Sequence, residues 1–157
     1  MSGSFDWVLL AYRLPREPST PRITVWRKLK RLGVAQLLDG LVALPGDART
    51  REQLEWIADE VIAAGGTATV WTGRPAGAKT ERQIAASMAE AITAEYQAIL
   101  DEAEAAQSAD GAERRRVLAR LRREVQRVGL RDHFPPPERE AARRGIRELA
   151  LLVEVSP

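Results

Sequence analysis

The order of apolar segments in the first half of the chain limits the fold more than any other feature. Short apolar runs alternate with two amphipathic stretches, and proline or glycine bounds most of them. The runs predict strands and the stretches predict helices. In chain order the predicted elements are strand 6–14, helix 21–32, strand 34–38, strand 41–44, a helix within 46–66 and strand 67–72. This order predicts a ferredoxin-like arrangement, in which two helices pack on one face of a four-stranded antiparallel sheet.

Turn residues support the same boundaries. Asp39-Gly40 separates two apolar runs by two residues, which is a strong signal for a β-hairpin. Gly33 is expected to end the first helix, and Gly65-Gly66 the second. The predicted order therefore has support from local backbone chemistry as well as from the apolar pattern.

The second half of the chain predicts helices and no strand. Apolar residues recur at helical spacing over 78–107, 112–128 and 137–153, and three consecutive prolines separate the last two stretches. We therefore predict an α+β protein. A ferredoxin-like domain is expected at residues 1–75, with a helical extension of about three helices, residues 76–157, packed on it.

Composition excludes several classes of site. The sequence holds no cysteine, so disulfides, zinc-thiolate sites and cysteine nucleophiles are not expected. His133 is its single histidine, which disfavours a catalytic triad or a histidine-rich metal site. No serine lies in a nucleophile elbow, and no glycine-rich phosphate loop follows a strand. We expect a protein that binds rather than catalyses, with no catalytic residue, metal or organic cofactor.

The sequence also gives no sign of a membrane segment. No apolar run approaches the roughly 20 residues that cross a bilayer. The start of the chain carries an acid, Asp6, where a signal peptide has basic residues. We therefore expect a cytoplasmic protein without a membrane partner.

Charges are segregated along the chain, although their sum is only +2. Residues 13–31 hold seven basic side chains and one acid, whereas residues 81–113 are mostly acidic. A third block, 114–131, holds eight arginines and one acid. Such blocks mark partner surfaces, or they arise where an acidic helix lies along a basic one.

The predicted helix 21–32 combines apolar and basic residues. At about 100° per residue, Val25, Trp26, Leu29 and Leu32 share one arc of about 120°, so we predict that Trp26 belongs to the core rather than to a base-stacking surface. The basic residues lie mostly opposite and have two interpretations, a solvated outer surface or a surface for nucleic-acid phosphate. The residues of the second interpretation are Arg16, Arg22, Arg27, Lys28, Lys30 and Arg31.

A second basic stripe lies on the predicted helix 112–128. Arg116, Arg120, Arg123 and Arg127 recur at spacings of four, three and four. The spacing suits a phosphate backbone. We favour ion pairs with the acidic residues of the preceding helix, which are Asp101, Glu102 and Glu104.

Several stretches resemble a known family. "PSTPRITVWRKLKRLG" with "DGLVALP", and later "RVGLRDHFPPPE", are similar to the ChrB N-terminal family of chromate-resistance regulators. The resemblance covers nearly the whole chain and implies a DNA-associated regulator in which chromate relieves repression. Full-length members carry a second, C-terminal domain, so we expect either a stand-alone homologue or a truncated piece.

Two partner hypotheses follow. The first is DNA, held by the basic helix. The second is a protein-interaction module without DNA affinity, in which an exposed sheet edge or the charged helices meet a second copy of the chain or a separate C-terminal-type domain.

A more distant likeness to Cas2-like nucleases gives a third hypothesis. These nucleases carry a metal-binding aspartate at the end of the first strand, and the matching residue here is Arg13. A cation at this position repels a divalent metal, so nuclease chemistry is disfavoured.

The "RDHFPPP" stretch suggests one small-ligand site. Arg131 and His133 are candidates for an oxyanion pocket, because chromate is a divalent anion and arginine binds such anions through two parallel hydrogen bonds. A purely structural role for His133, beside Asp132, is the interpretation that we favour.

Overall fold

The computed structural model describes residues 6–155. Residues 1–5 of the predicted ferredoxin-like domain and residues 156–157 of the predicted helical extension lie outside this range. The chain forms two compact units, one ending at Ala85 and the other beginning at Ala86, and we describe each by itself.

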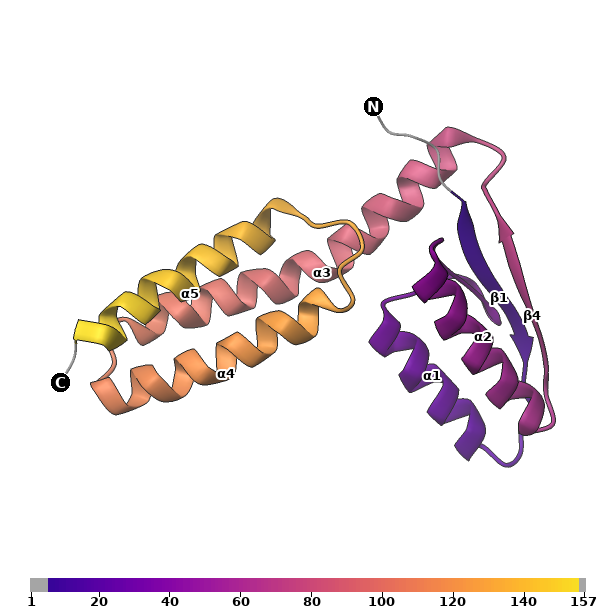
Figure 1. The fold of residues 1–157 in the computed structure, drawn as a ribbon, viewed down its shortest axis with the longest axis horizontal. Helices are drawn as coiled ribbons and strands as arrows, with labels where there is room; N and C mark the ends of the chain where they lie inside the picture. Colours follow the sequence, from indigo (N-terminus) through magenta and orange to yellow (C-terminus); the bar gives the residue numbers. More distant parts are fainter. Residues whose placement is uncertain (1–5, 156–157) are drawn as a thin grey trace. The chain divides into compact units, whose positions relative to one another are not determined.

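The first unit is a four-stranded antiparallel sheet with two helices (Figure 1). Its elements are β1 (Trp7–Arg13), α1 (Thr20–Leu32), β2 (Ala35–Leu38), β3 (Leu41–Pro45), α2 (Ala48–Ala63) and β4 (Thr67–Gly73). The strand order is β2-β3-β1-β4, and each neighbouring pair is antiparallel. The predicted α+β fold and the order of its elements are confirmed.

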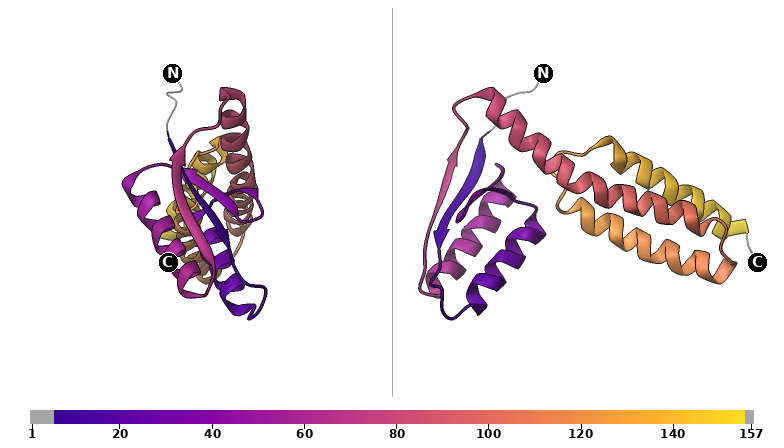
Figure 2. Two further views of the ribbon diagram at one scale, coloured as in Figure 1. Left: turned by 90° about the vertical axis from the view of Figure 1, so that its right-hand side faces the viewer. Right: turned by 180° about the vertical axis from the view of Figure 1, so that it is seen from behind.

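Alternation along the strands places the core of this unit on one face of the sheet. Val8 and Leu10 of β1 and Val42 and Leu44 of β3 are almost fully buried. Their side chains share a cluster with the apolar residues of α1 and α2, and both helices lie on the same side of the strands (Figure 2). On the other face, Trp7 is covered where its indole Nε1 donates a hydrogen bond to Glu81 Oε1 at 3.1 Å.

Local backbone chemistry fixes the ends of these elements. Gly40 has a φ of +77°, and a Cβ built there would lie 2.4 Å from the carbonyl oxygen of Tyr12. The hairpin between β2 and β3 therefore needs glycine at this position. Helix α2 begins with a capping box, because the Asp47 carboxylate accepts a hydrogen bond from Thr50 N at 2.7 Å and Thr50 Oγ1 accepts one from Asp47 N at 3.0 Å.

One core prediction for α2 is wrong. The apolar pattern places Ile62 with Leu54, Ile57 and Val61 on the buried face. Those three residues are buried, but 54% of Ile62 is exposed to solvent. Ile62 lies on the flank of the helix, about 100° from the buried Val61.

The second unit is helical (Figure 1). It contains the larger part of α3 (Ala78–Ala106), together with α4 (Gly111–Gly129) and α5 (Pro137–Val155). Its core is built from one stripe of each helix: Ile92, Tyr96, Ile99, Ala103 and Ala106 of α3, Leu118, Leu121 and Val128 of α4, and Ala142, Ile146 and Leu149 of α5. Gly145 allows α5 to approach α3, since a Cβ there would lie 2.7 Å from Leu100 Cδ1. None of the helices in the described range is both long and apolar enough to span a bilayer.

Candidate nucleic-acid interface

Helix α1 is held by a narrow apolar stripe. Val25 and Leu29 are each 2% exposed, and Leu32 is half-buried. Pro21 lies in the first turn, and Gly33 ends the helix with a φ of 73°. The helix therefore forms where the sequence predicts it and shows most of its circumference to solvent.

The prediction that Trp26 lies in the core is wrong. Its side chain is 51% exposed, and the ammonium group of Lys30 lies 4.4 Å from the centre of its ring. The reason is the rotation of α1 about its axis. Around the helix axis, Trp26 lies about 100° from Val25 in one direction and Lys28 about 60° in the opposite direction. Lys28 is half-buried and forms an ion pair with Glu60 of α2. This rotation turns Trp26 out of the core and into the basic surface.

Five of the six predicted phosphate-binding residues face solvent. They are Arg16, Arg22, Arg27, Lys30 and Arg31. Within residues 6–155, none of these five forms an ion pair with a carboxylate. Lys28 differs, because Glu60 already neutralises its charge. We call the five side chains, together with Trp26, the α1 surface.

The other helix of this unit carries the opposite charge. Glu52, Glu55 and Asp59 on α2 are exposed, and they surround Trp56, which is 63% exposed. Helix α2 also carries Arg49 and Arg51, and Arg51 pairs with Glu55 at 3.0 Å, so its excess of negative charge is small. The exposed charges of α1 and α2 thus differ in sign.

Arg22, in the first turn of α1, and the acidic Asp39 both influence the side chain of Tyr12. Burial raises the pKa of the Tyr12 phenol, the charge of Arg22 lowers it and the charge of Asp39 raises it. The charges of Arg22 and Asp39 therefore act in opposite directions on the Tyr12 phenol.

Three arginines of the α4 stripe are paired with carboxylates. Arg120 pairs with Glu102 of α3, as the sequence predicts, with 2.5 Å between Nη2 and Oε2. Arg116 and Arg127 pair instead within α4, with Glu113 at 3.0 Å and Glu124 at 2.7 Å. The stripe is thus neutralised at three of its four positions, and we do not place the nucleic-acid interface there.

Arg131 and His133 lie in the turn between α4 and α5, and both are half-buried. The guanidinium of Arg131 donates two hydrogen bonds to the Glu95 carboxylate, at 2.7 and 2.9 Å, and this pairing raises the pKa of Arg131. An oxyanion at Arg131 would therefore compete with Glu95 for the same donors. The oxyanion pocket stays a prediction.

The residue between them has a role that the sequence analysis missed. The Asp132 side chain is fully buried and its Oδ2 accepts a hydrogen bond of 2.7 Å from the Tyr96 hydroxyl. Burial and this bond raise the pKa of Tyr96. The two residues are 36 positions apart, so no local pattern could have paired them.

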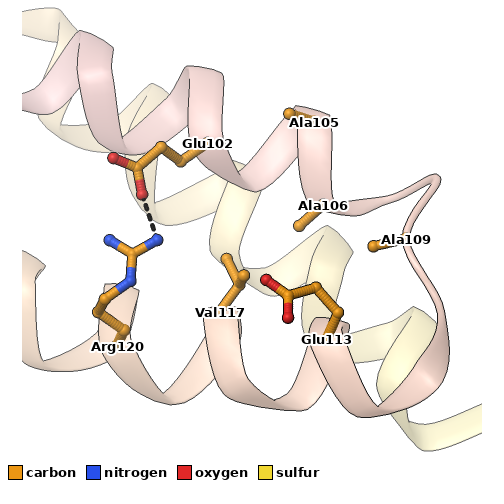
Figure 3. Close-up of a pocket in the computed structure, with 7 residues that line it drawn as sticks. All are labelled: Glu102, Ala105, Ala106, Ala109, Glu113, Val117 and Arg120. Atoms are coloured by element: carbon orange, nitrogen blue, oxygen red, sulfur yellow. Dashed lines mark ion pairs between the residues drawn. The ribbon is translucent and has the colours of Figure 1, made fainter.

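The described residues also show one open depression, at the end of α3 and the start of α4 (Figure 3). Its volume is about 340 Å³. It is lined by Glu102, Ala105, Ala106, Ala109, Glu113, Val117 and Arg120. Its charged groups are already in ion pairs, Glu102 with Arg120 and Glu113 with Arg116, and the remaining lining is alanine and valine. This depression offers no free group for catalysis.

The described part of the chain shows no cluster of side chains that could hold a metal ion. No three histidine or carboxylate side chains of residues 6–155 lie close enough together to hold a metal ion. Arg13 is exposed at the end of β1, opposite Thr67 of β4.

Comparison with known proteins decides the family. The family model described as Protein ChrB, N-terminal, matches residues 22–110, which is more than half of the chain and includes most of α1. This chain belongs to the ChrB N-terminal family. It is 30% identical over 131 residues to Protein ChrB of Cupriavidus metallidurans (strain ATCC 43123 / DSM 2839 / NBRC 102507 / CH34). The match covers 82% of this chain and 40% of that ChrB, so the chain spans well under half the length of its relative. No solved structure matches the chain.

Proposed function

We propose that the sheet unit binds the phosphate backbone of DNA through the α1 surface, and that this contact serves the regulation of chromate resistance. The observation that carries the proposal is the set of five exposed cations without carboxylate partners among the described residues. Membership of the ChrB family supports the regulatory role.

Phosphate contacts of this kind have a defined signature. Each neutralised phosphate of duplex DNA releases counterions, so the logarithm of the binding constant falls by about 0.9 per contact for each logarithmic unit of salt. Such contacts position a protein on DNA without reading its sequence. We therefore expect affinity from α1, and sequence preference from other residues.

A charge reversal on α1 tests the proposal. We expect Arg27→Glu, Lys30→Glu and Arg31→Glu, combined, to reduce affinity for a labelled duplex by roughly tenfold or more at low salt. The matched control is Arg115→Glu, Arg122→Glu and Arg123→Glu on α4. These three arginines are exposed and, within the described residues, unpaired. The control changes net charge by the same amount, so equal losses in both variants would show that α1 is not the interface.

Trp26 and Ile23 favour a second candidate function. They are 51% and 46% exposed on the same helix as the cations, and an aromatic side chain among arginines is typical of protein interfaces. In that case the α1 surface meets another protein, such as a C-terminal-type ChrB domain. DNA binding that is absent at every salt concentration, together with binding of such a domain that Trp26→Ala abolishes, would favour this alternative.

We further propose that the chain is not a nuclease. Arg13 supports this, because its positive charge stands where Cas2-like nucleases hold a metal with an aspartate. Addition of Mg²⁺ or Mn²⁺ to the same DNA should leave the duplex intact, and metal-dependent cleavage that co-purifies with the chain would refute the proposal.

A further inference from the structure

The free edge of β4 is not used by the proposed DNA contact. All seven residues of β4 pair with β1, and β4 is the last strand of the sheet in the described part of the chain. Successive residues of a strand direct their amide and carbonyl groups to alternate sides. The side to which each β4 residue points can therefore be worked out from β1.

Hydrogen bonds at the two ends of β1 give this alternation. Tyr12 N donates to Gly40 O, and Gly46 N donates to Asp6 O, so the even-numbered residues of β1 face β3. The odd-numbered residues then face β4 and bond to its odd-numbered partners, which run from Thr67 to Gly73. The amide and carbonyl groups of Ala68, Val70 and Thr72 consequently point to the open edge.

The two edges of the sheet differ in their protection. On the opposite edge, β2 has only four residues and a register shift, and Gln36 Nε2 donates a hydrogen bond to Leu38 O at 2.7 Å. Short length, the register shift and the occupied carbonyl of Leu38 discourage pairing with another chain. β4 has seven residues in unbroken register, with no charged residue and no proline. It is the kind of edge that accepts another strand.

A helix flank beside this edge is also uncovered. Glu60 marks the flank of α2 that faces α1, because it pairs with Lys28. Ile62 comes two residues later, about 200° around the helix, and thus lies on the flank that faces away from α1, above the β4 side of the sheet. It is 54% exposed. If a strand of another chain paired with β4, and a helix of that chain covered the added strand, the added helix would bury Ile62.

We propose that β4 pairs with β4 of a second copy of the chain. The strand is self-complementary, because a two-fold axis at Val70 aligns all seven residues antiparallel to themselves. This register places Trp71 opposite Thr69 of the second copy, and Ala68 opposite Thr72. Aromatic and β-branched side chains stabilise each other in such cross-strand pairs. The uncharged strand gives no like-charge repulsion between the copies, and the first charge that follows, Arg74, lies 3.6 Å from Asp6 of its own chain.

The pairing joins two sheets into one of eight strands. Directly opposite residues of an antiparallel pair point to the same face, so the helices of both copies cover the same face of the joined sheet. The proposed contact is limited to one strand pair and one helix flank, whereas stable interfaces bury roughly 1,200–2,000 Å². We therefore expect a dimer that dissociates on dilution.

Amide hydrogen exchange of the full chain at several concentrations tests the pairing. The amides of Thr69 and Trp71 should be protected at all concentrations, because β1 holds them. The amides of Ala68, Val70 and Thr72 should be exposed in dilute solution and become protected as the dimer forms. A monomer at every concentration, or a dimer in which these three amides stay unprotected, would overturn the proposal.

Proline at the free edge provides the matched variant. Thr72→Pro removes an amide that β1 does not use, which an edge strand tolerates, whereas Thr72→Val keeps that amide. By sedimentation velocity, Thr72→Pro should remain monomeric where wild type and Thr72→Val form dimers. Circular dichroism confirms that both variants are folded, and a folded Thr72→Pro dimer would contradict the assignment. If proline unfolds the sheet, the exchange pattern of wild type still decides the matter.

Discussion

At the residue scale, the contact between Lys30 and the Trp26 indole stands on the exposed side of α1. Removing the indole should therefore cost little. We expect Trp26→Ala to lower the free energy of unfolding by less than about 1 kcal/mol, whereas Leu29→Ala, at a position 2% exposed, should cost about 2–5 kcal/mol. Urea unfolding of both variants measures the difference. Equal losses would mean that Trp26 is part of the core.

The error over Trp26 shows a limit of helical periodicity. The pattern correctly assigns Val25 and Leu29 to the core. An arc of about 120° is wide, so the pattern does not determine whether residues at the borders of the arc, such as Trp26, are buried. The ion pair between Lys28 and Glu60 accompanies a rotation towards α2. These residues are 32 positions apart, so the rotation depends on a long-range contact. The same reasoning applies to Ile62, which stands at the border of the α2 stripe.

The Asp47 cap gives a prediction about pH. Hydrogen bonds from Thr50, above all from its backbone N–H, lower the pKa of Asp47. The charged cap therefore stabilises α2 above the unfolded pKa of about 3.9, and the stabilisation is lost as pH falls through the lower pKa of the folded state. Asp47→Ala should cost about 0.5–2 kcal/mol at neutral pH. Its difference from wild type should shrink in unfolding experiments below pH 4 or so. A difference that does not change with pH would contradict this origin.

At the element scale, the order and type of the elements follow from local signals. Gly33 and Gly40 are both at positive φ in the structure, as their places in the sequence predict. The sequence contains less information about the connections between distant elements. Arg131 has an obvious family motif around it, yet its partner, Glu95, lies on another helix. The sequence thus predicts the exposed cations of α1 but cannot show which other cations are already neutralised.

The bond between Tyr96 and Asp132 joins α3 to the turn after α4. Asp132 Oδ1 is buried without a hydrogen-bond partner within the described residues. Oδ2 accepts the hydrogen bond of the Tyr96 hydroxyl at 2.7 Å and lies 3.7 Å from Arg139 Nη1. Tyr96→Phe should lower the free energy of unfolding of the helical unit by about 1–3 kcal/mol. Tyr12→Phe is the control, since the half-buried Tyr12 is not bonded to a buried carboxylate. Thermal unfolding should separate the two variants, and similar melting temperatures would refute the structural role of the bond.

At the scale of the whole molecule, charge is distributed so that α1 is the exposed basic element of the sheet unit. In the helical unit six arginines pair with carboxylates, whereas Arg115, Arg122 and Arg123 of α4 are exposed and, within the described residues, unpaired. Helix α2 holds more acidic than basic residues. The net charge of +2 hides this separation. The chain spans 40% of the length of its ChrB relative, so we propose only phosphate contact, and not sequence recognition or chromate sensing, for this part.

The salt dependence of duplex binding tests this account most directly. With five phosphate contacts, the logarithm of the binding constant should fall against the logarithm of salt with a slope of about −4.5. Reversal of Arg27, Lys30 and Arg31 leaves two contacts, for which the slope should be about −2. A wild-type slope near zero, or one that this variant does not change, would contradict the central claim that the α1 surface binds DNA phosphate.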